Sequence, residues 1–271
     1  MPKLSLILAA RNDNYCGDSP GRLQITLNHA GVKLHEHDAE ILVCDWGSRV
    51  PLREVLTLNA HAKEITRFHY IPRILTSQFP VQFSEVHALN SVARWAAGDF
   101  IGRIDQDTLI GERFVKWFYS GEPSERCFYW WSARRDMKKD QPLDLHESCR
   151  ESLDRGEIWR TAVGIFLMPT RTYHDLRGYD ERTIYKNHIE HEFFWRLKQV
   201  LEFVDLGKLV DYDFYHLWHD RADNKRQKRN VMLDLPTLKN LPLRPNPVRW
   251  GLQTEPGRLF SPQQVNDDGR N

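Results

Sequence analysis

The stretch GDFIGRIDQDTLIG, residues 98–111, decides how the rest of the chain is interpreted. After an apolar run typical of a buried strand, it carries Asp105 and Asp107 with one residue between them. Side chains at i and i+2 of an extended segment point the same way, so these carboxylates can converge on one cation. Carboxylates alone favour a hard ion such as Mg²⁺ or Mn²⁺. The alternative is a solvated turn after the strand, where aspartate is also common.

The composition limits the class of protein. A chain of 271 residues can form one large domain or two small ones, and 41% hydrophobic with 28% charged residues is typical of a soluble globular protein. The 38 basic and 37 acidic residues give a net charge of +1, which does not favour nucleic acid as a partner. The apolar run at 4–10 is too short for a transmembrane segment or a convincing signal peptide. Four cysteines without paired spacing predict reduced thiols and a cytoplasmic location.

Strand and helix patterns alternate in the first part of the chain. Continuous apolar runs predict buried strands at 3–10, 40–45, 64–71 and 99–105. Between them we expect helices at 51–58 and 84–97, and a first helix with Ser19 as N-cap, Pro20 at its first position and Gly31 at its end. This alternation predicts an α/β fold with a mixed, mostly parallel sheet flanked by helices. Ligands bind such sheets at the carboxyl ends of the strands, where Asn12, Asp13, Asp45, Asp105 and Asp107 all fall.

The second part of the chain is less regular. The segment CFYWWSARRDM, residues 127–137, predicts a strand, and a charged loop follows at 138–160. Further strands are expected at 162–169 and 209–218, with a helix at 187–201 between them. Six prolines in residues 236–271 predict an extended tail that wraps the domain or hangs free.

Three segments, taken in order, resemble GT-A fold glycosyltransferases. Residues 83–111 are similar to a helix bearing an asparagine that leads into the strand with the DxD motif. Residues 164–197 resemble the acceptor-side segment with its glycine, methionine, acidic pair and final Arg-Leu, and residues 215–230 resemble the ending in which a histidine completes a metal site. The pattern is similar to family 2 inverting transferases and beta-1,4-galactosyltransferases, over roughly residues 3–230.

The resemblance implies a GT-A (Rossmann-like) glycosyltransferase domain at 1–235. Its nucleotide-sugar half would lie at about 1–110 and its acceptor half at about 111–235, followed by the proline-rich tail. The implied activity is a metal-dependent, inverting transfer from a UDP-sugar to an acceptor glycan, glycolipid or glycoprotein. Mn²⁺ or Mg²⁺ would be the cofactor, and a histidine among the ligands favours Mn²⁺. We expect neither nucleic acid as a partner nor a transmembrane segment.

Carried over residue by residue, the resemblance also implies the site. Asp107 would bind the metal directly, with Asp105 near metal and ribose and with His219 as a further ligand, although His216 is a rival. Counting back from the Arg-Leu pair makes Glu190 the catalytic base, or Glu192 instead. The implied contacts to the nucleotide sugar are Ala9, Arg11, Asp45, Asn90, Arg103, Asp105 and Gln106.

The chain departs from the family pattern in three places. IEHE, residues 189–192, replaces the acidic pair, which leaves the base open between the two glutamates. YKNH, residues 185–188, replaces the Trp-Gly loop of galactosyltransferases, so galactose specificity does not follow. Arg11 replaces the tyrosine that often stacks on uracil, and its guanidinium can also stack on a base.

Each of these residues also has a structural interpretation. Glu190 can close a capping box with Asn187, and Glu192 can form an i, i+4 surface pair with Arg196. Asp45 can cap a strand end, and the histidine pairs 188/191 and 216/219 can form a structural zinc site. The alternative functions are a non-catalytic glycan-binding or assembly protein and a metal-dependent phosphodiester hydrolase. A nucleotidyltransferase is disfavoured because AARNDN, residues 9–14, stands in place of a glycine-rich loop.

Overall fold

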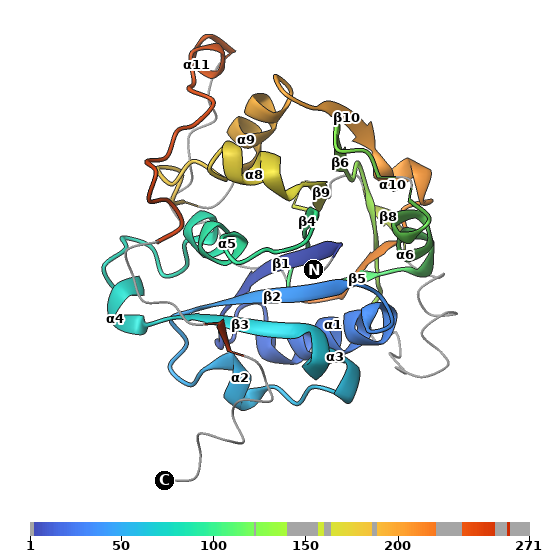
Figure 1. The fold of residues 1–271 in the computed structure, drawn as a ribbon. Coiled ribbons are helices and arrows are strands. Elements are labelled where there is room, and N and C mark those ends of the chain that lie inside the picture. Colours follow the sequence, from blue (N-terminus) through green and yellow to red (C-terminus); the bar gives the residue numbers. More distant parts are fainter. Residues whose placement is uncertain are drawn as a thin grey trace.

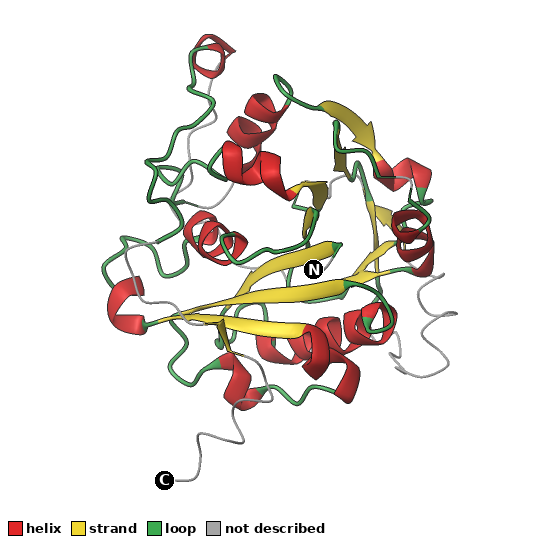
Figure 2. Cartoon of the chain, viewed as in Figure 1, coloured by secondary structure: helices red, strands yellow, loops and turns green. Residues whose placement is uncertain are grey.

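The structure, a computed structural model, describes residues 3–121, 123–139, 157–159, 164–185, 189–220, 235–252 and 259–260. Its strands form two sheets (Figures 1 and 2). The large sheet has the order β10 (Glu202–Asp205), β6 (Cys127–Trp130), β9 (Phe166–Pro169), β4 (Phe100–Arg103), β1 (Leu4–Ala10), β2 (Ala39–Trp46), β3 (Thr66–Ile71) and β12 (Leu259–Phe260). The small sheet has the order β5 (Thr108–Ile110), β11 (Phe214–His216), β7 (Arg134–Asp136) and β8 (Glu157–Trp159).

The large sheet is mixed, with a parallel centre. Strands β3, β2, β1 and β4 run parallel, and β6 is parallel to β10, whereas β9 and β12 run antiparallel to their neighbours. The predicted α/β fold with a mostly parallel sheet is therefore confirmed. Strand order reverses at β1, because the chain builds β2 and β3 on one side of it and then returns to add β4 on the other. Such a switch point leaves a crevice at the carboxyl ends of the two central strands.

Helices cover both faces of this sheet (Figure 1). One face carries α1 (Ser19–Leu34), α2 (Leu52–Val55) and α3 (Ala60–Ile65), and the other carries α5 (Glu85–Ala93), α8 (Thr170–Asp175) and α9 (Ile189–Leu197). The remaining helices are α4 (Arg73–Thr76), α6 (Glu112–Tyr119), α10 (Leu206–Leu209) and α11 (Leu235–Lys239). Within the described ranges, no helix combines the length and apolar character that crossing a bilayer requires.

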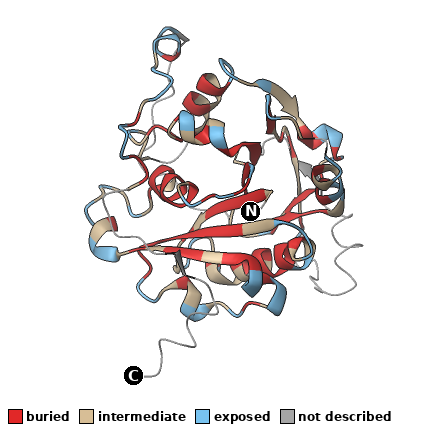
Figure 3. Ribbon diagram, viewed as in Figure 1, coloured by how far each residue is buried: buried red, intermediate tan, exposed pale blue. Residues whose placement is uncertain are grey.

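Two hydrophobic cores lie on opposite faces of the large sheet, and side chains of β1 belong alternately to one and to the other. Leu6 and Leu8 lie in the core shared with α1 and α3, while Ile7 lies in the core shared with α5 and α9. All three side chains are buried because successive residues of a central strand face opposite, covered sides of the sheet (Figure 3). This is why the strand appears in the sequence as a continuous apolar run.

The ends of α1 differ from the prediction. The N-cap is Asp18, whose Oδ1 accepts a hydrogen bond from Gly21 N at 3.1 Å, so Ser19 is the first helical residue. The helix also continues past Gly31 to Leu34. A Cβ on Gly31 would lie 2.5 Å from the backbone nitrogen of Ala62. The glycine therefore allows α1 and α3 to pack closely and does not end the helix.

The segment 127–137 is two strands, not one. Residues 127–130 form β6 of the large sheet, and residues 134–136 form β7 of the small sheet. Its pattern of apolar and aromatic residues is continuous, so the sequence does not indicate where the chain leaves the large sheet and enters the small one. The helix predicted at 84–97 is shorter than expected, the helix predicted at 187–201 ends at Leu197, and residues 64–65 belong to α3.

The described part of the tail packs against the domain. Trp250 is buried in the core beside α5 and lies 6.1 Å from the ring of Tyr173. Asn246 donates to the carbonyl of Arg177 at 2.7 Å, and β12 adds an antiparallel edge to β3. The described residues of the tail therefore follow the first of the two expected arrangements and pack on the domain. The domain division at residue 235 stays a prediction.

Candidate active site

Residues 104–107 connect the two sheets. β4 ends in the large sheet, and β5 begins in the small sheet at Thr108. Thr108 N donates to the carbonyl of Asp105 at 3.1 Å, which closes a tight turn. The expectation of an extended segment with two parallel carboxylates is therefore wrong. The turn sends the side chains of Asp105 and Asp107 to different partners.

Asp107 meets two histidines that the small sheet supplies. β11 pairs antiparallel with β5, placing His216 opposite Thr108, and Leu217 N donates to the carbonyl of Asp107 at 2.9 Å. His216 Nε2 lies 3.5 Å from Asp107 Oδ1, and His219 Nε2 lies 3.4 Å from Asp107 Oδ2. Ligand atoms of all three side chains lie within 4.8 Å of one another. We call these three side chains the metal cluster.

The hydrogen bonds of the two histidines indicate which ring nitrogen is protonated. His219 Nδ1 lies 2.7 Å from the carbonyl of Asp220, which can only accept, so this nitrogen carries the proton. His216 Nδ1 lies 3.1 Å from Asp136 Oδ1, again an acceptor. In the neutral rings both Nε2 atoms are then unprotonated and face the carboxylate of Asp107. Acceptor atoms that face one another at this spacing fit a shared cation, since metal bonds of about 2.1 Å separate neighbouring ligands by about 3 to 3.5 Å.

The electrostatic surroundings also favour a cation. Asp107 is only 6% exposed, and burial raises the pKa of its carboxyl against the opposing influence of His216 and His219. Among the described residues, the nearest arginine nitrogen with a recorded contact is Arg22 Nε, 3.8 Å from Asp107 Oδ2 and too far for a hydrogen bond. A divalent ion at the cluster would stabilise the ionised carboxylate.

Asp105 lies beside the metal cluster and is held by two arginines. Its Oδ1 is 3.5 Å from Arg103 Nη2, and its Oδ2 is 3.6 Å from Arg134 Nη1. Its neighbour Gln106 accepts a hydrogen bond from Ser19 Oγ at 2.9 Å. In this geometry the carboxylate of Asp105 belongs to an ion-pair chain beside the cluster.

Arg103 joins Asp105 to Glu190. The guanidinium is 3% exposed and donates to Glu190 Oε1 at 3.0 Å and to Tyr179 Oη at 2.8 Å, with a further contact to Glu85. Burial alone would lower the pKa of Arg103, but Tyr179 and the surrounding carboxylates raise it, so the group stays charged. One buried cation thus links the first turn of α9 with the carboxyl end of β4.

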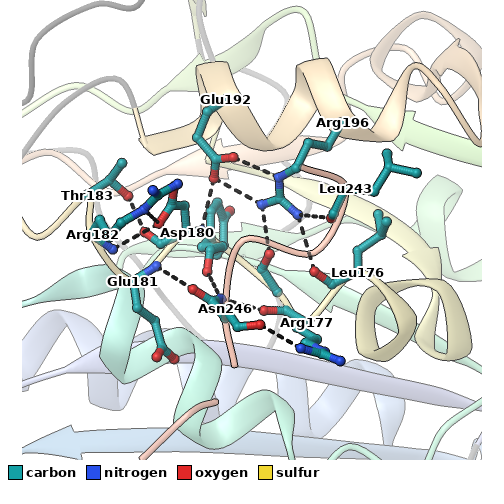
Figure 4. A network of polar contacts seen from close by, with 12 residues as sticks. Leu176, Arg177, Asp180, Glu181, Arg182, Thr183, Glu192, Arg196, Leu243 and Asn246 are labelled. Atoms are coloured by element: carbon teal, nitrogen blue, oxygen red, sulfur yellow. Dashed lines mark hydrogen bonds and ion pairs between the residues drawn. The ribbon is translucent and has the colours of Figure 1, made fainter. Parts of the chain in front are cut away.

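Glu192 faces a different environment (Figure 4). Its Oε2 accepts from Arg196 Nε at 2.8 Å, and its Oε1 accepts from Arg196 Nη2 and Asp180 N, each at 3.0 Å. Arg196 also donates to the carbonyl of Gly178 at 2.8 Å. The side chains of Glu192 and Arg196 are 2% and 0% exposed, so the expectation of a surface pair is wrong. The pair is a buried structural link in which both carboxylate oxygens already accept hydrogen bonds.

Asp45 and Asn90 are also enclosed by hydrogen bonds. Asp45 is 1% exposed, contacts the hydroxyl of Ser48 and accepts from Leu52 N at 2.7 Å, which is the strand-end cap of the alternative interpretation. Burial raises the pKa of this carboxyl. Asn90 is fully buried and donates to the carbonyl of Tyr179 at 2.9 Å. Both side chains have structural partners in the fold, and their contacts with a nucleotide sugar stay predictions.

The other predicted nucleotide contacts lie at the end of β1. Ala9 is half-buried opposite Cys44 of β2. Arg11 donates to the carbonyl of Gln82 at 2.7 Å and pairs with Asp13 at 3.5 Å. Asn187 and His188, on which the capping box and the zinc site depend, lie outside the described residues, as does the basic segment 221–230. Roles of Ala9, Arg11 and Gln106 toward a nucleotide sugar stay predictions.

Three residues near the metal cluster have no role in the sequence prediction: Arg22, Arg134 and Asp136. Asp136 and Arg134 come from β7, inside a segment whose aromatic residues predict only a strand. The contact between Asp136 and His216 depends on the pairing of β7 with β11, and no spacing in the sequence marks that pairing. Arg22 is a buried residue of α1, and nothing in the sequence pattern distinguishes it from a surface arginine.

Comparisons with known proteins give the following similarities. No protein-family model and no curated protein matches the sequence. The chain is similar to a fragment of S. aureus TarS in complex with UDP, with 12% identity and a TM-score of 0.49, over 80% of this chain and 60% of that one. It is also similar to the catalytic domain of Drosophila beta1,4-galactosyltransferase 7 in complex with xylobiose, with 13% identity and a TM-score of 0.48, over 89% and 79% of the two chains.

A mutant of the Drosophila enzyme in complex with manganese, UDP-Gal and xylobiose gives 14% identity and a TM-score of 0.49, over 89% of this chain and 80% of that one. These proteins are GT-A glycosyltransferases, the family that the sequence motifs resemble. This chain spans 60% of the length of the TarS fragment.

Proposed function

We propose that this protein is a metal-dependent, inverting glycosyltransferase that moves a sugar from a UDP-sugar to a hydroxyl of a glycan, glycolipid or glycoprotein. The main support is the metal cluster, in which Asp107, His216 and His219 turn acceptor atoms toward one point. Its place supports the proposal too, because the cluster follows β4 at the switch point of the sheet. A nucleotide diphosphate fits that position in an open α/β sheet.

The proposed residues form two groups, one that would bind the donor and one that would activate the acceptor. A divalent cation, when bound, neutralises the charge that grows on the leaving diphosphate. Asp107, His216 and His219 would hold it, and two imidazoles beside one carboxylate favour Mn²⁺ over Mg²⁺. Asp105, fixed by Arg103 and Arg134, would orient the donor. None of these residues has to move a proton.

Glu190 is the base in this proposal. The attacking hydroxyl must lose its proton to a carboxylate within hydrogen-bond reach. Glu190 has a side chain 16% exposed and contacts Arg103 at 3.0 Å, whereas Glu192 accepts three hydrogen bonds inside the fold. Arg103 then couples the base to the donor side through Asp105. Inversion needs one base and no carboxylate nucleophile.

The alternative functions predict different behaviour. A non-catalytic glycan-binding protein would bind a sugar without cleaving a UDP-sugar. A structural zinc site typically has four protein ligands, and the described cluster has three. A phosphodiester hydrolase remains the chemical rival, because a carboxylate and two histidines can also activate water. It would cleave a phosphodiester without transferring a sugar.

Calorimetry and a donor panel test the proposal. We expect UDP to bind in the presence of Mn²⁺ and to bind at least tenfold more weakly in EDTA, because the cation bridges protein and diphosphate. A panel of UDP-sugars, incubated without acceptor, should show slow hydrolysis of one donor. Absence of any UDP binding with Mn²⁺, or cleavage of a simple phosphodiester in place of UDP-sugars, would overturn the proposal.

A further inference from the structure

Strand β7 brings a carboxylate behind the metal cluster. In the parallel pairing of β7 with β11, Asp136 stands in register with His216. Asp136 Oδ1 lies 3.1 Å from His216 Nδ1, on the side of the ring away from Asp107. The imidazole therefore lies between two carboxylates, one at each nitrogen. Only the Nε2 side faces the other members of the cluster.

Asp136 is itself held in place by Arg134. Arg134 Nε donates to Asp136 Oδ1 at 3.3 Å, and the same guanidinium reaches Asp105 Oδ2 at 3.6 Å. An ionised Asp136 has lone pairs for both donors. The chain of contacts from Asp105 through Arg134 and Asp136 ends at His216.

We propose that Asp136 is a positioning residue for the metal centre: it keeps the proton of His216 on Nδ1 and fixes the ring so that Nε2 points at the cation. This inference rests on the metal centre of the proposed function. Carboxylates behind metal-binding histidines act in this way generally, and their loss typically weakens metal binding by about 10- to 100-fold. His219 needs no such side chain, because its Nδ1 donates to the backbone carbonyl of Asp220.

The test measures the affinity of the full chain for Mn²⁺ alone, by the loss of the free-ion signal in electron paramagnetic resonance. We expect Asp136→Asn to bind Mn²⁺ about tenfold more weakly, because a neutral amide accepts less strongly and no longer fixes the tautomer. Asp211→Asn is the matched control. It removes the same charge from a carboxylate that pairs with Arg135 of the same strand at 3.2 Å, and its affinity should stay within about twofold of the wild type.

A double-mutant cycle separates positioning from simple charge. In the His216→Ala background, Asp136→Asn should change the Mn²⁺ affinity by less than about twofold, because Asp136 acts through the ring that is absent. A tenfold loss in both backgrounds would mean a through-space effect of charge and would overturn the inference. An unchanged affinity of Asp136→Asn in the wild-type background would overturn it as well.

The cycle also separates this inference from the proposed function. If the wild-type chain binds no Mn²⁺, the metal centre and the role of Asp136 both fail. If the wild type and Asp136→Asn bind equally well, only the role of Asp136 fails. Asparagine has nearly the shape of aspartate, so a thermal unfolding midpoint without metal that matches the wild type shows that β7 is intact. Asp136→Ala should follow Asp136→Asn with a larger loss of affinity.

Discussion

The metal cluster and the buried network around Glu192 both remove charged side chains from water, but they do so in opposite ways. Around Glu192, the carboxylate oxygens accept from Arg196 and from a backbone nitrogen. In the metal cluster, the Nε2 atoms of His216 and His219 face the carboxylate of Asp107, and acceptor atoms that approach one another in this way need a cation or a proton between them. A buried carboxylate whose oxygens already accept hydrogen bonds from the protein indicates a structural role. Acceptor atoms of several side chains that converge on one point indicate a binding site.

The largest effect that this comparison predicts is at the cluster itself. Asp107→Ala removes the central ligand, so we expect transfer from the UDP-sugar to fall by about four orders of magnitude, since metal ions supply several kcal/mol of charge stabilisation. Turnover with saturating Mn²⁺ measures it. Asp99→Ala, at an exposed position before the start of β4 and so at the opposite end of that strand from the turn, is the control and should keep full activity. A fully active Asp107→Ala would refute the role of the cluster.

The next effect distinguishes the two glutamates of α9. Glu190→Gln should lower kcat by about three orders of magnitude, the middle of the range for a lost general base, while leaving the affinity for Mn²⁺ and UDP unchanged within about twofold. Steady-state kinetics and calorimetry on one preparation provide both values. Normal turnover in Glu190→Gln would show that another group takes the proton.

Glu192→Gln should affect the fold and not the chemistry. Breaking a buried pair leaves Arg196 partly uncompensated, so we expect a loss of about 3 kcal/mol in the free energy of unfolding, measured by chemical denaturation. Glu202→Gln, at an exposed position of β10, should change that free energy by less than about 0.5 kcal/mol. An unchanged free energy together with lost turnover would instead make Glu192 the base.

The smallest effect concerns a histidine that is buried outside the cluster. His29 is 4% exposed, its Nε2 contacts the carbonyl of Ile110 at 2.7 Å, and burial lowers its pKa to about 4. The unfolded chain binds a proton near pH 6.5 and the folded chain does not, so stability is lost as pH falls. We expect about 2 kcal/mol of loss from this group between pH 7.5 and pH 5.

The same pH series on His29→Gln provides the control. Denaturation midpoints of this variant should fall less steeply between pH 7.5 and pH 5 than those of the wild type. Equal slopes would show that His29 does not titrate differently in the two states.

Much of the fold follows from local patterns. The run at 4–10 predicts β1 because a strand covered on both faces must be apolar at every position. The end of α1 could not be predicted, since Gly31 matches a helix-ending glycine until α3 is seen to pack against it. The split of residues 127–137 between two sheets depends on pairing partners far away in the sequence.

Prediction of the site from the sequence is limited in the same way, because it too depends on contacts between distant segments. Asp107, His216 and His219 could be proposed from the order of family motifs, and the structure brings their ligand atoms together. Asp136 could not, because an aspartate in a strand acquires its role only from the register of β7 with β11. Local sequence likewise could not separate Glu190 from Glu192, since the difference lies in burial and in partners distant in the sequence: Glu192 is enclosed in the fold, whereas Glu190 meets Arg103.

The most direct test is anomalous diffraction from crystals grown with Mn²⁺ and UDP. We expect one manganese peak about 2.2 Å from a carboxylate oxygen of Asp107 and from the Nε2 atoms of His216 and His219, with the diphosphate on its open side. A peak bound elsewhere, or UDP seated with no metal between its phosphates and Asp107, would contradict it.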